Sequence, residues 1–248
     1  MTPAPPVTPA ARERPRVHRE VVSFVRRSAR LTAGQRTAWE QHASRWVLDV
    51  PHADTETSID PDYSMDLTRL FGREAPLVVE IGSGTGDSLV PMAAARPECN
   101  VLAFEVYQPA VAQTLAKLGR AGVDNVRLAP VNAVEGLATL LDESSLHELW
   151  LFFPDPWHKS RHHKRRLLTP AFADLVATRL QPGATWRLAT DWEDYAVAMR
   201  QVLDDHDAFD NLHPDGWAPR WAERPVTRFE ERGVAAGRTV FDLGYRRR

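Results

Sequence analysis

Three glycines follow a short apolar segment in the stretch LVVEIGSGTGDSLV, residues 77–90, and this feature constrains the fold most strongly. Gly82, Gly84 and Gly86 stand where a predicted strand turns into a predicted helix. Such a turn lets a ligand approach the backbone closely, because glycine has no side chain to obstruct it. The stretch therefore predicts a cofactor-binding loop at the carboxyl end of a strand, although a glycine loop alone is also compatible with an ordinary turn.

Short apolar segments alternate with amphipathic ones from residue 77 onward. This alternation is typical of an α/β fold in which helices cover both faces of a mostly parallel sheet. Strands are expected at residues 77–81, 101–105, 126–129, 148–153, 185–190 and 239–245. Helices are expected at residues 33–46, 87–95, 109–121, 133–141, 170–180 and 192–204, and a loop at residues 51–61.

The length of 248 residues, 43% of them hydrophobic, allows one sizeable core. We expect a single domain over residues 31–248, with a cofactor half at about 75–150 and a substrate half at about 150–248. Residues 1–30 are expected to form a disordered, basic arm, because they are rich in proline and arginine and poor in apolar periodicity.

Charge and cysteine content limit the class of protein. The 31 Lys and Arg against 33 Asp and Glu give a net charge of −2, so any affinity for nucleic acid must come from local clusters of cations. The single cysteine, Cys99, excludes an intramolecular disulfide and favours a reducing compartment. No segment approaches the roughly 18 apolar residues of a membrane span. We therefore expect a cytoplasmic protein that does not bind membranes.

Polar side chains stand near the ends of the first three predicted strands, at Glu80, Glu105 and Asn132. A dinucleotide cofactor would require another glycine spacing, and its pyrophosphate would be repelled by a carboxylate at Glu80. S-adenosylmethionine has no phosphate and carries a sulfonium and an ammonium that carboxylates attract. We predict that it is the cofactor and leaves as S-adenosylhomocysteine, with Glu105 on the ribose hydroxyls and Asn132 on the adenine edge. The residues predicted to bind it here are Glu80, Gly82, Gly84, Gly86, Glu105 and Asn132.

An aspartate between two prolines follows the fourth predicted strand, in the stretch FFPDPWHKSRHHKRR. Pro154 and Pro156 restrict the backbone around Asp155, so its carboxylate is held at the sheet edge where such folds place their active sites. Trp157 offers a flat face for stacking. The cations that follow can neutralise several phosphates, although a run of charges is often only a solvated face. The residues predicted to bind RNA are Arg161, His162, His163, Lys164, Arg165 and Arg166.

These motifs, with TDW at residues 190–192 and RPVTRFEERG at residues 224–233, resemble the bacterial tRNA (guanine-N7-)-methyltransferase family. The resemblance covers the chain from about residue 21 to its end. It implies a Rossmann-like class I S-adenosylmethionine-dependent methyltransferase with a mostly parallel, seven-stranded sheet and helices on both faces. It also implies transfer of a methyl group to N7 of the guanine at position 46 in the variable loop of tRNA.

The resemblance further implies roles for single residues. Asp155 would contact S-adenosylmethionine and be central to catalysis. The residues implied to contact the substrate are Lys159, Asp191, Thr227, Arg228, Phe229 and Glu230. Two positions depart from the family pattern, since Asn132 stands where aspartate is frequent and Arg228 where lysine is frequent. Residues 227–230 are expected to form a loop in which Glu230 pairs with guanine N1–H and N2–H2, or alternatively makes a charge pair within the loop.

The chemistry of guanine N7 limits what the protein must supply. Its lone pair lies in the plane of the ring, so no general base is needed. A fixed carboxylate near the purine stabilises the positive charge that develops there, and Asp155 and Asp191 are the candidates. Asp155 could instead orient the base through its N–H edge.

Other interpretations remain open from the residues alone. Related enzymes that methylate exocyclic amines or glutamine side chains have an Asn/Asp-Pro-Pro-aromatic motif where this chain has Pro-Asp-Pro-Trp. An RNA-binding scaffold without catalysis and, more distantly, a dehydrogenase are further alternatives. No metal is expected, because His162 and His163 lack a suitably spaced carboxylate or cysteine. The chain is expected to be a monomer or a homodimer.

Overall fold

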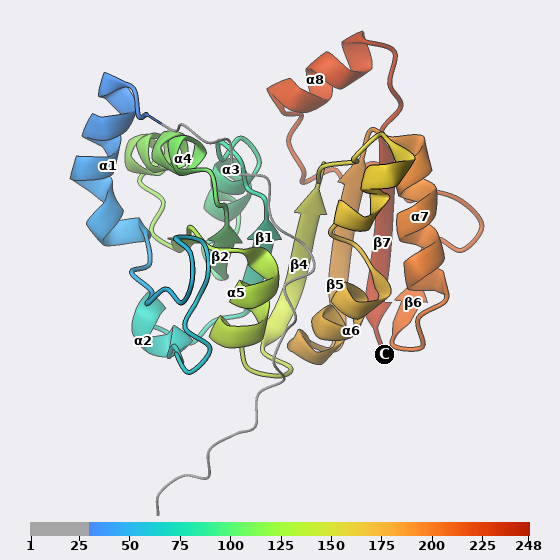
Figure 1. The fold of residues 1–248 in the computed structure, drawn as a ribbon, viewed down its shortest axis with the longest axis horizontal. Coiled ribbons are helices and arrows are strands. Elements are labelled where there is room, and N and C mark those ends of the chain that lie inside the picture. The colour runs from blue at the N-terminus through green and yellow to red at the C-terminus, as the bar shows by residue number, and fades with distance from the viewer. Residues whose placement is uncertain (1–29) are drawn as a thin grey trace, which may run out of the picture.

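The computed structural model describes residues 30–248, and the expected arm at residues 1–30 lies outside them except for Arg30. A seven-stranded sheet has the strand order β3-β2-β1-β4-β5-β7-β6 (Figure 1). The strands are β1 (Leu77–Ile81), β2 (Asn100–Phe104), β3 (Val126–Ala129), β4 (Leu146–Phe152), β5 (Leu180–Thr190), β6 (Phe209–Asn211) and β7 (Phe241–Arg247). The first five strands pair in parallel, and β7 runs antiparallel to β5 and β6.

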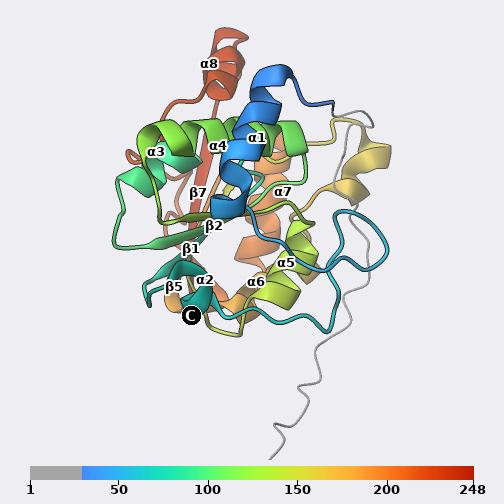
Figure 2. The ribbon, with the colours of Figure 1, turned by 90° about the vertical axis from the view of Figure 1, so that its left-hand side faces the viewer.

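Helices cover both faces of this sheet (Figures 1 and 2). One buried cluster joins β1, β4 and β5 to α5, α6 and α7 through side chains such as Leu137, Phe172 and Met199. The other joins the opposite face to α1, α3 and α4 through Trp46, Leu89 and others. The helices are α1 (Ala33–Trp46), α2 (Leu67–Phe71), α3 (Leu89–Ala94), α4 (Gln108–Ala121), α5 (Ala133–Leu140), η1 (Ser160–Arg165), α6 (Pro170–Arg179), α7 (Glu193–Asp204) and α8 (Arg228–Ala235).

Local sequence explains where several helices begin and end. Thr32 and Gln35 form a reciprocal capping box at the start of α1. Asn132 and Thr169 each accept backbone N–H groups at the starts of α5 and α6. Helix α4 ends at Gly122, whose φ of 64° is left-handed. The ends of the helices that border the site are therefore set by their own residues.

The predicted mostly parallel sheet of seven strands with helices on both faces is confirmed. The strands and helices that the sequence predicts all occur, with ends within about two residues, except that β5 begins earlier than expected. Four elements were not expected from the sequence: α2, η1, the three-residue β6 and α8. The loop expected at residues 227–230 is wrong, because Thr227 caps α8 and the helix starts at the next residue.

Helix α8 stands at the edge of the sheet where β4 ends (Figure 1). The loops after β1, β2, β3 and β4 meet at the same edge, as parallel strands require. Among the residues that the structure describes, no helix combines the length and the apolar character needed to cross a membrane.

Candidate active site

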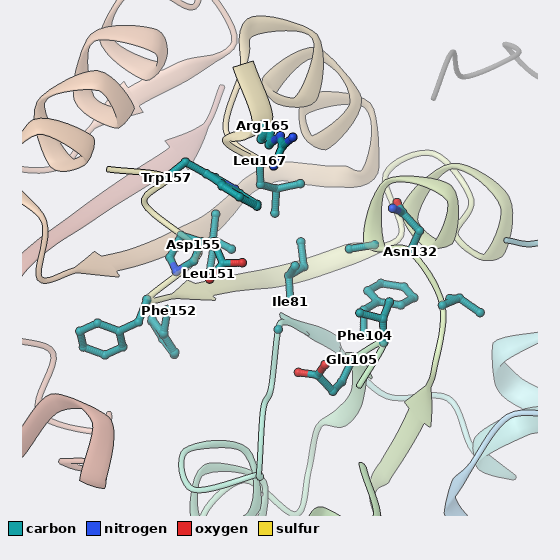
Figure 3. A pocket seen from close by; sticks show the side chains of 16 residues that line it. Ile81, Phe104, Glu105, Asn132, Leu151, Phe152, Asp155, Trp157, Arg165 and Leu167 are labelled. Carbon is teal, nitrogen blue, oxygen red and sulfur yellow. The ribbon is translucent and has the colours of Figure 1, made fainter. Parts of the chain in front are cut away.

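A cavity of about 260 Å³ opens at the carboxyl ends of the parallel strands (Figure 3). Gly82, Glu105, Asn132 and Asp155, from the loops after β1, β2, β3 and β4, all border it. Apolar side chains such as Phe104 form much of the remaining wall. The topology thus brings together four residues that were predicted as a site from positions far apart in the sequence.

The glycine loop has the backbone conformation that its sequence predicts. Gly82 and Gly86 both have a φ of 73°, in the left-handed region that side chains disfavour. A Cβ atom at Gly86 would lie 2.8 Å from the Thr114 side chain of α4. The N–H of Gly82 donates to the carbonyl of Phe104 at 2.8 Å, which holds the loop against β2.

Glu105 connects the glycine loop to the second strand. Its Oε2 accepts the N–H of Gly84 at 2.9 Å, and its Oε1 accepts the N–H of Tyr107 at 2.8 Å. Burial raises the pKa of this carboxyl, and the negative charge of Asp155 raises it further. A carboxylate oxygen has two lone pairs, so Glu105 can still accept hydrogen bonds from a ligand in the cavity.

Glu80 is almost fully buried in β1, directly before the loop. Its Oε1 accepts the hydroxyl of Ser88 at 3.1 Å, while its Oε2 has no hydrogen-bond partner among the described residues. Burial is the main cause that raises the pKa of Glu80 to about 8. A buried carboxyl oxygen without a partner is unusual, and it favours a polar or cationic ligand nearby.

Asn132 is buried and borders the cavity at the start of α5. Its Oδ1 accepts the N–H of Val134 at 2.9 Å and of Glu135 at 3.4 Å. The side chain therefore caps the helix, a function that aspartate performs equally well. This shared capping ability explains how asparagine can stand where the family pattern has aspartate.

The segment around Asp155 is sharply bent. Phe153 and Trp157 have φ values of 50° and 49°, which are rare for residues with side chains. Figure 3 shows Asp155 pointing from the end of β4 toward the space that Glu105 faces from the end of β2. Partial shielding from solvent raises the pKa of the Asp155 carboxyl, and the nearby His158 opposes this effect.

Trp157 and Arg165 form one wall of the cavity. The Arg165 guanidinium lies 4.9 Å from the centre of the Trp157 ring, and His162 meets the edge of that ring. Lys159, Arg161, Lys164 and Arg165 are exposed around this wall. The prediction of a cationic surface beside Asp155 thus agrees with the geometry of η1.

Arg166 differs from the cations before it, and its burial corrects the prediction that it binds RNA. Only 5% of the residue is exposed. Its Nε donates to the Pro156 carbonyl at 2.9 Å, and its Nη2 pairs with Asp194 of α7. A guanidinium that is buried between these partners is not available to a phosphate.

Helix α8 carries the second substrate motif. The Oγ1 of Thr227 accepts the N–H of Glu230 at 3.2 Å, which caps the helix. The Phe229 ring packs on Phe153 at 5.2 Å, yet about half of Phe229 remains exposed at 48%. Aromatic surface is therefore presented close to Asp155.

Glu230 lies inside the molecule, so the predicted pairing with the guanine edge is corrected. Its Oε1 accepts Arg220 Nε at 3.0 Å, and its Oε2 accepts Arg224 Nη1 at 2.8 Å. Arg224 also donates to both carboxylate oxygens of Asp242 in β7. The alternative of a charge pair describes Glu230 better, in a buried network that attaches α8 to the sheet.

Asp191 follows β5 and is largely buried below α8. Its Oδ2 lies 2.8 Å from Arg238 Nε, and Gly233 of α8 approaches it so closely that a Cβ atom there would clash. The described residues that border the cavity do not include Asp191, Lys159 or any residue of α8. The residues predicted after the first strands thus border the cavity more often than the residues predicted to contact the substrate.

Comparison with known proteins shows the family to which the chain belongs. A model of the family described as "Putative methyltransferase" matches residues 74–243. The chain is 52% identical over 240 residues to the tRNA (guanine-N(7)-)-methyltransferase of Cutibacterium acnes, covering 96% of this chain and 87% of the relative. It is 53% identical over 230 residues to that of Nocardioides sp., covering 93% and 88%.

The chain belongs to the tRNA (guanine-N7-)-methyltransferase family.

More distant members of the family agree over the same length. The tRNA (guanine-N(7)-)-methyltransferase of Salmonella typhimurium is 45% identical over 242 residues, with 97% of each chain covered. The resemblance that the sequence motifs indicate is therefore confirmed. A solved structure of the 16S rRNA methyltransferase KamB matches with a TM-score of 0.51 and 16% identity, covering 79% of this chain and 94% of that one. That likeness confirms the fold alone, a Rossmann-like class I methyltransferase fold.

Proposed function

We propose that this member of the tRNA (guanine-N7-)-methyltransferase family transfers a methyl group from S-adenosylmethionine to N7 of guanine in tRNA, at position 46 of the variable loop. The observation that carries the proposal is the cavity in which Asp155 and Glu105 face each other beside Gly82. Cations and aromatic rings surround the same opening, which suits a nucleic-acid substrate.

The residues present fit S-adenosylmethionine. Glu80 would balance its positive charge, Glu105 would accept the ribose hydroxyls, and Asn132 would lie at the adenine. The loop from Gly82 to Gly86 would approach it through the backbone. The unpaired Oε2 of Glu80 supports this assignment, since a cation is the partner that a buried carboxyl oxygen lacks. When bound, the cofactor supplies a methyl group on a sulfonium.

Asp155 acts on the purine side of the transfer. Guanine N7 needs no activating base, so the task of the protein is to align the base and to stabilise the developing positive charge. Pro154, Pro156 and the left-handed Trp157 hold the Asp155 carboxylate in place at the rim. That carboxylate can oppose the purine charge or accept its N–H groups, and both actions favour the transition state.

The tRNA would lie across η1 and α8. Exposed cations of η1 would contact phosphates, and Phe229 with Trp157 would offer faces for stacking. Lys159 and Arg228 remain candidates for substrate contacts because both are exposed. Asp191 and Glu230 would act indirectly, by supporting α8 from below.

The organisation that the sequence predicts is retained in this proposal. A single domain spans residues 31–248, since both cores are built on one continuous sheet. The loops after β1 to β3 serve the cofactor, and the segments after β4 serve the substrate. A monomer or a homodimer is compatible with this arrangement.

The test uses bulk tRNA from cells that lack the modification. Labelled methyl from S-adenosylmethionine is expected to enter this tRNA, and chemical cleavage at N7-methylguanine is expected to cut within the variable loop. Incorporation that nucleoside analysis assigns to N6-methyladenine would point instead to an enzyme acting on exocyclic amines. Cofactor binding without any methyl transfer would point to a non-catalytic RNA-binding protein.

A further inference from the structure

The backbone that carries Asp155 is strained at both ends. Phe153 and Trp157, on either side of Pro154-Asp155-Pro156, have left-handed φ values of 50° and 49°. Residues with a Cβ atom adopt this conformation at a cost in free energy, and they keep it only where the surrounding structure holds them. The direction of the Asp155 side chain therefore depends on contacts outside the segment itself.

Few main-chain groups are available to hold this segment, because Pro154 and Pro156 have no N–H. At its start, the N–H of Phe153 donates to the carbonyl of Ala189 in β5 at 2.7 Å. Toward its other end, the Pro156 carbonyl accepts a hydrogen bond from Arg166 Nε at 2.9 Å. Arg166 thus contacts the backbone one residue after Asp155.

The remainder of the Arg166 side chain is anchored in the protein. Its Nη2 pairs with Asp194 in the first turn of α7 and lies 3.1 Å from His163 Nε2. Its guanidinium carbon lies 4.7 Å from the centre of the Tyr195 ring. The hydrogen bond from Arg166 lowers the pKa of the Asp194 carboxyl, which indicates that the pair is charged at neutral pH.

We propose that Arg166 is a positioning residue, which ties the strained segment of Asp155 to the start of α7 and so keeps the carboxylate directed into the cavity. This inference rests on the proposed function and refines it. The basic stretch then has two roles: Arg161, Lys164 and Arg165 are exposed toward RNA, whereas Arg166 faces inward.

Substitution by lysine separates the two possible roles of Arg166. Lysine keeps the positive charge, so a phosphate contact would be largely preserved, but its single ammonium cannot bond Pro156 and Asp194 as a rigid guanidinium does. R166K is expected to lower kcat about tenfold or more, since small displacements of a reacting group are costly. Its KM for tRNA and the salt dependence of tRNA binding are expected to stay within about twofold of wild type.

Arg161→Ala is the matched comparison, because Arg161 belongs to the same basic stretch but is exposed. It is expected to raise the KM for tRNA and to flatten the salt dependence, as loss of a phosphate contact does. If R166K instead behaves like R161A, with weaker binding, a flatter salt dependence and an undiminished kcat, Arg166 is an RNA contact and the inference is overturned.

Hydrogen exchange tests the positioning role of Arg166 without a measurement of catalysis. In the protein without cofactor or tRNA, R166K is expected to speed amide exchange in residues 151–159 while the central strands remain protected. Asp194→Asn, which keeps Arg166 and changes an exposed carboxylate, is expected to produce the same local effect and to lower kcat about threefold. This variant decides the matter if R166K does not fold. Unchanged exchange in residues 151–159 of both variants, or an unchanged kcat in Asp194→Asn, would overturn the inference. Failure of the wild-type protein to methylate tRNA would refute the proposed function. The exchange measurements would still test whether Arg166 holds the segment of Asp155.

Discussion

Burial and, to a smaller extent, the negative charge of Asp155 across the cavity raise the pKa of the Glu105 carboxyl, against backbone hydrogen bonds that lower it. The two carboxylates thus lie within electrostatic reach of each other in a space that Gly82 also borders. A negative charge that opposes the ionisation of a second carboxyl favours a cation between the two groups. A sulfonium cofactor meets this condition, whereas a nucleotide phosphate would add to the repulsion.

Removal of the Glu105 charge is expected to weaken cofactor binding. Glu105→Gln keeps an oxygen that can accept the Gly84 N–H but loses the charged hydrogen bonds to the ribose. The Kd for S-adenosylmethionine, measured by calorimetry, is expected to rise about tenfold or more. Glu74→Gln is the control, because Glu74 is exposed near the opposite end of β1. Equal Kd values for both variants would argue against Glu105 as a ligand.

Glu80 makes stability depend on pH in a defined direction. Burial raises the pKa of Glu80 to about 8. The ordinary pKa of glutamate is 4.5, so between these values the folded state holds a proton that the unfolded chain releases. The contribution of Glu80 to stability is complete at low pH and is lost as the pH rises through about 8.

The Tm of the cofactor-free protein is therefore expected to contain a Glu80 component that falls as the pH rises from about 4.5 to about 8. Glu80→Gln removes the titrating group at nearly constant volume, so its Tm is expected to change less across this range. Thermal unfolding followed by circular dichroism measures both proteins. An identical pH dependence in the two would show that Glu80 does not titrate there.

Gly86 is expected to tolerate no side chain. Gly86→Ala combines a left-handed φ with a clash against Thr114, so it is expected to lower the free energy of unfolding by about 1–3 kcal/mol and to impair cofactor binding. Gly34→Ala in α1 is the control, because no atom lies within 4 Å of the added methyl group. Chemical denaturation compares the two, and equal stabilities would contradict the strain assigned to the loop.

Asp155→Ala is expected to reduce turnover much more than tRNA affinity. The carboxylate is assigned to the charge that appears during transfer, so its loss is expected to slow the single-turnover rate about 100-fold or more. The Kd for tRNA is expected to change by less than about threefold, because the exposed cations supply most of that affinity. A variant with the wild-type single-turnover rate would refute the role of Asp155.

The residues that border the cavity could largely be predicted from the sequence, because simple geometry determines where they lie. Carboxyl ends of parallel strands meet at one edge, so residues directly after predicted strands had to converge. Glu105 and Asp155 follow this rule, and both border the cavity. Their convergence needed no knowledge of which side chains are in contact.

The substrate side was harder to predict because burial depends on partners distant in the sequence. In the sequence, Arg166 is one more cation of a basic stretch. In the structure, Asp194 and Tyr195 enclose it. The sequence gives no sign that Glu230 is paired, whereas in the structure it forms ion pairs with Arg220 and Arg224. These contacts arise from loop paths that apolar periodicity does not encode.

Helix α8 left a signal in the sequence that could have been recognised. Thr227 and Glu230 have the Thr-x-x-Glu spacing of a capping box. The structure uses half of this box, since Thr227 accepts the Glu230 N–H while the Glu230 side chain turns to the arginines. This spacing is typical of a helix start, although residues 227–230 were expected to form a loop.

Methyl transfer to N7 of the guanine at position 46 can be tested with a single altered nucleotide. A tRNA transcript that carries 7-deazaguanosine at position 46 has no N7 lone pair but keeps the shape and the phosphates of the substrate. Methyl transfer to this transcript is expected to vanish while its Kd matches that of the unmodified transcript, which is expected to accept about one methyl group per molecule. Equal methyl incorporation into both transcripts would show that N7 of this guanine is not the methyl acceptor.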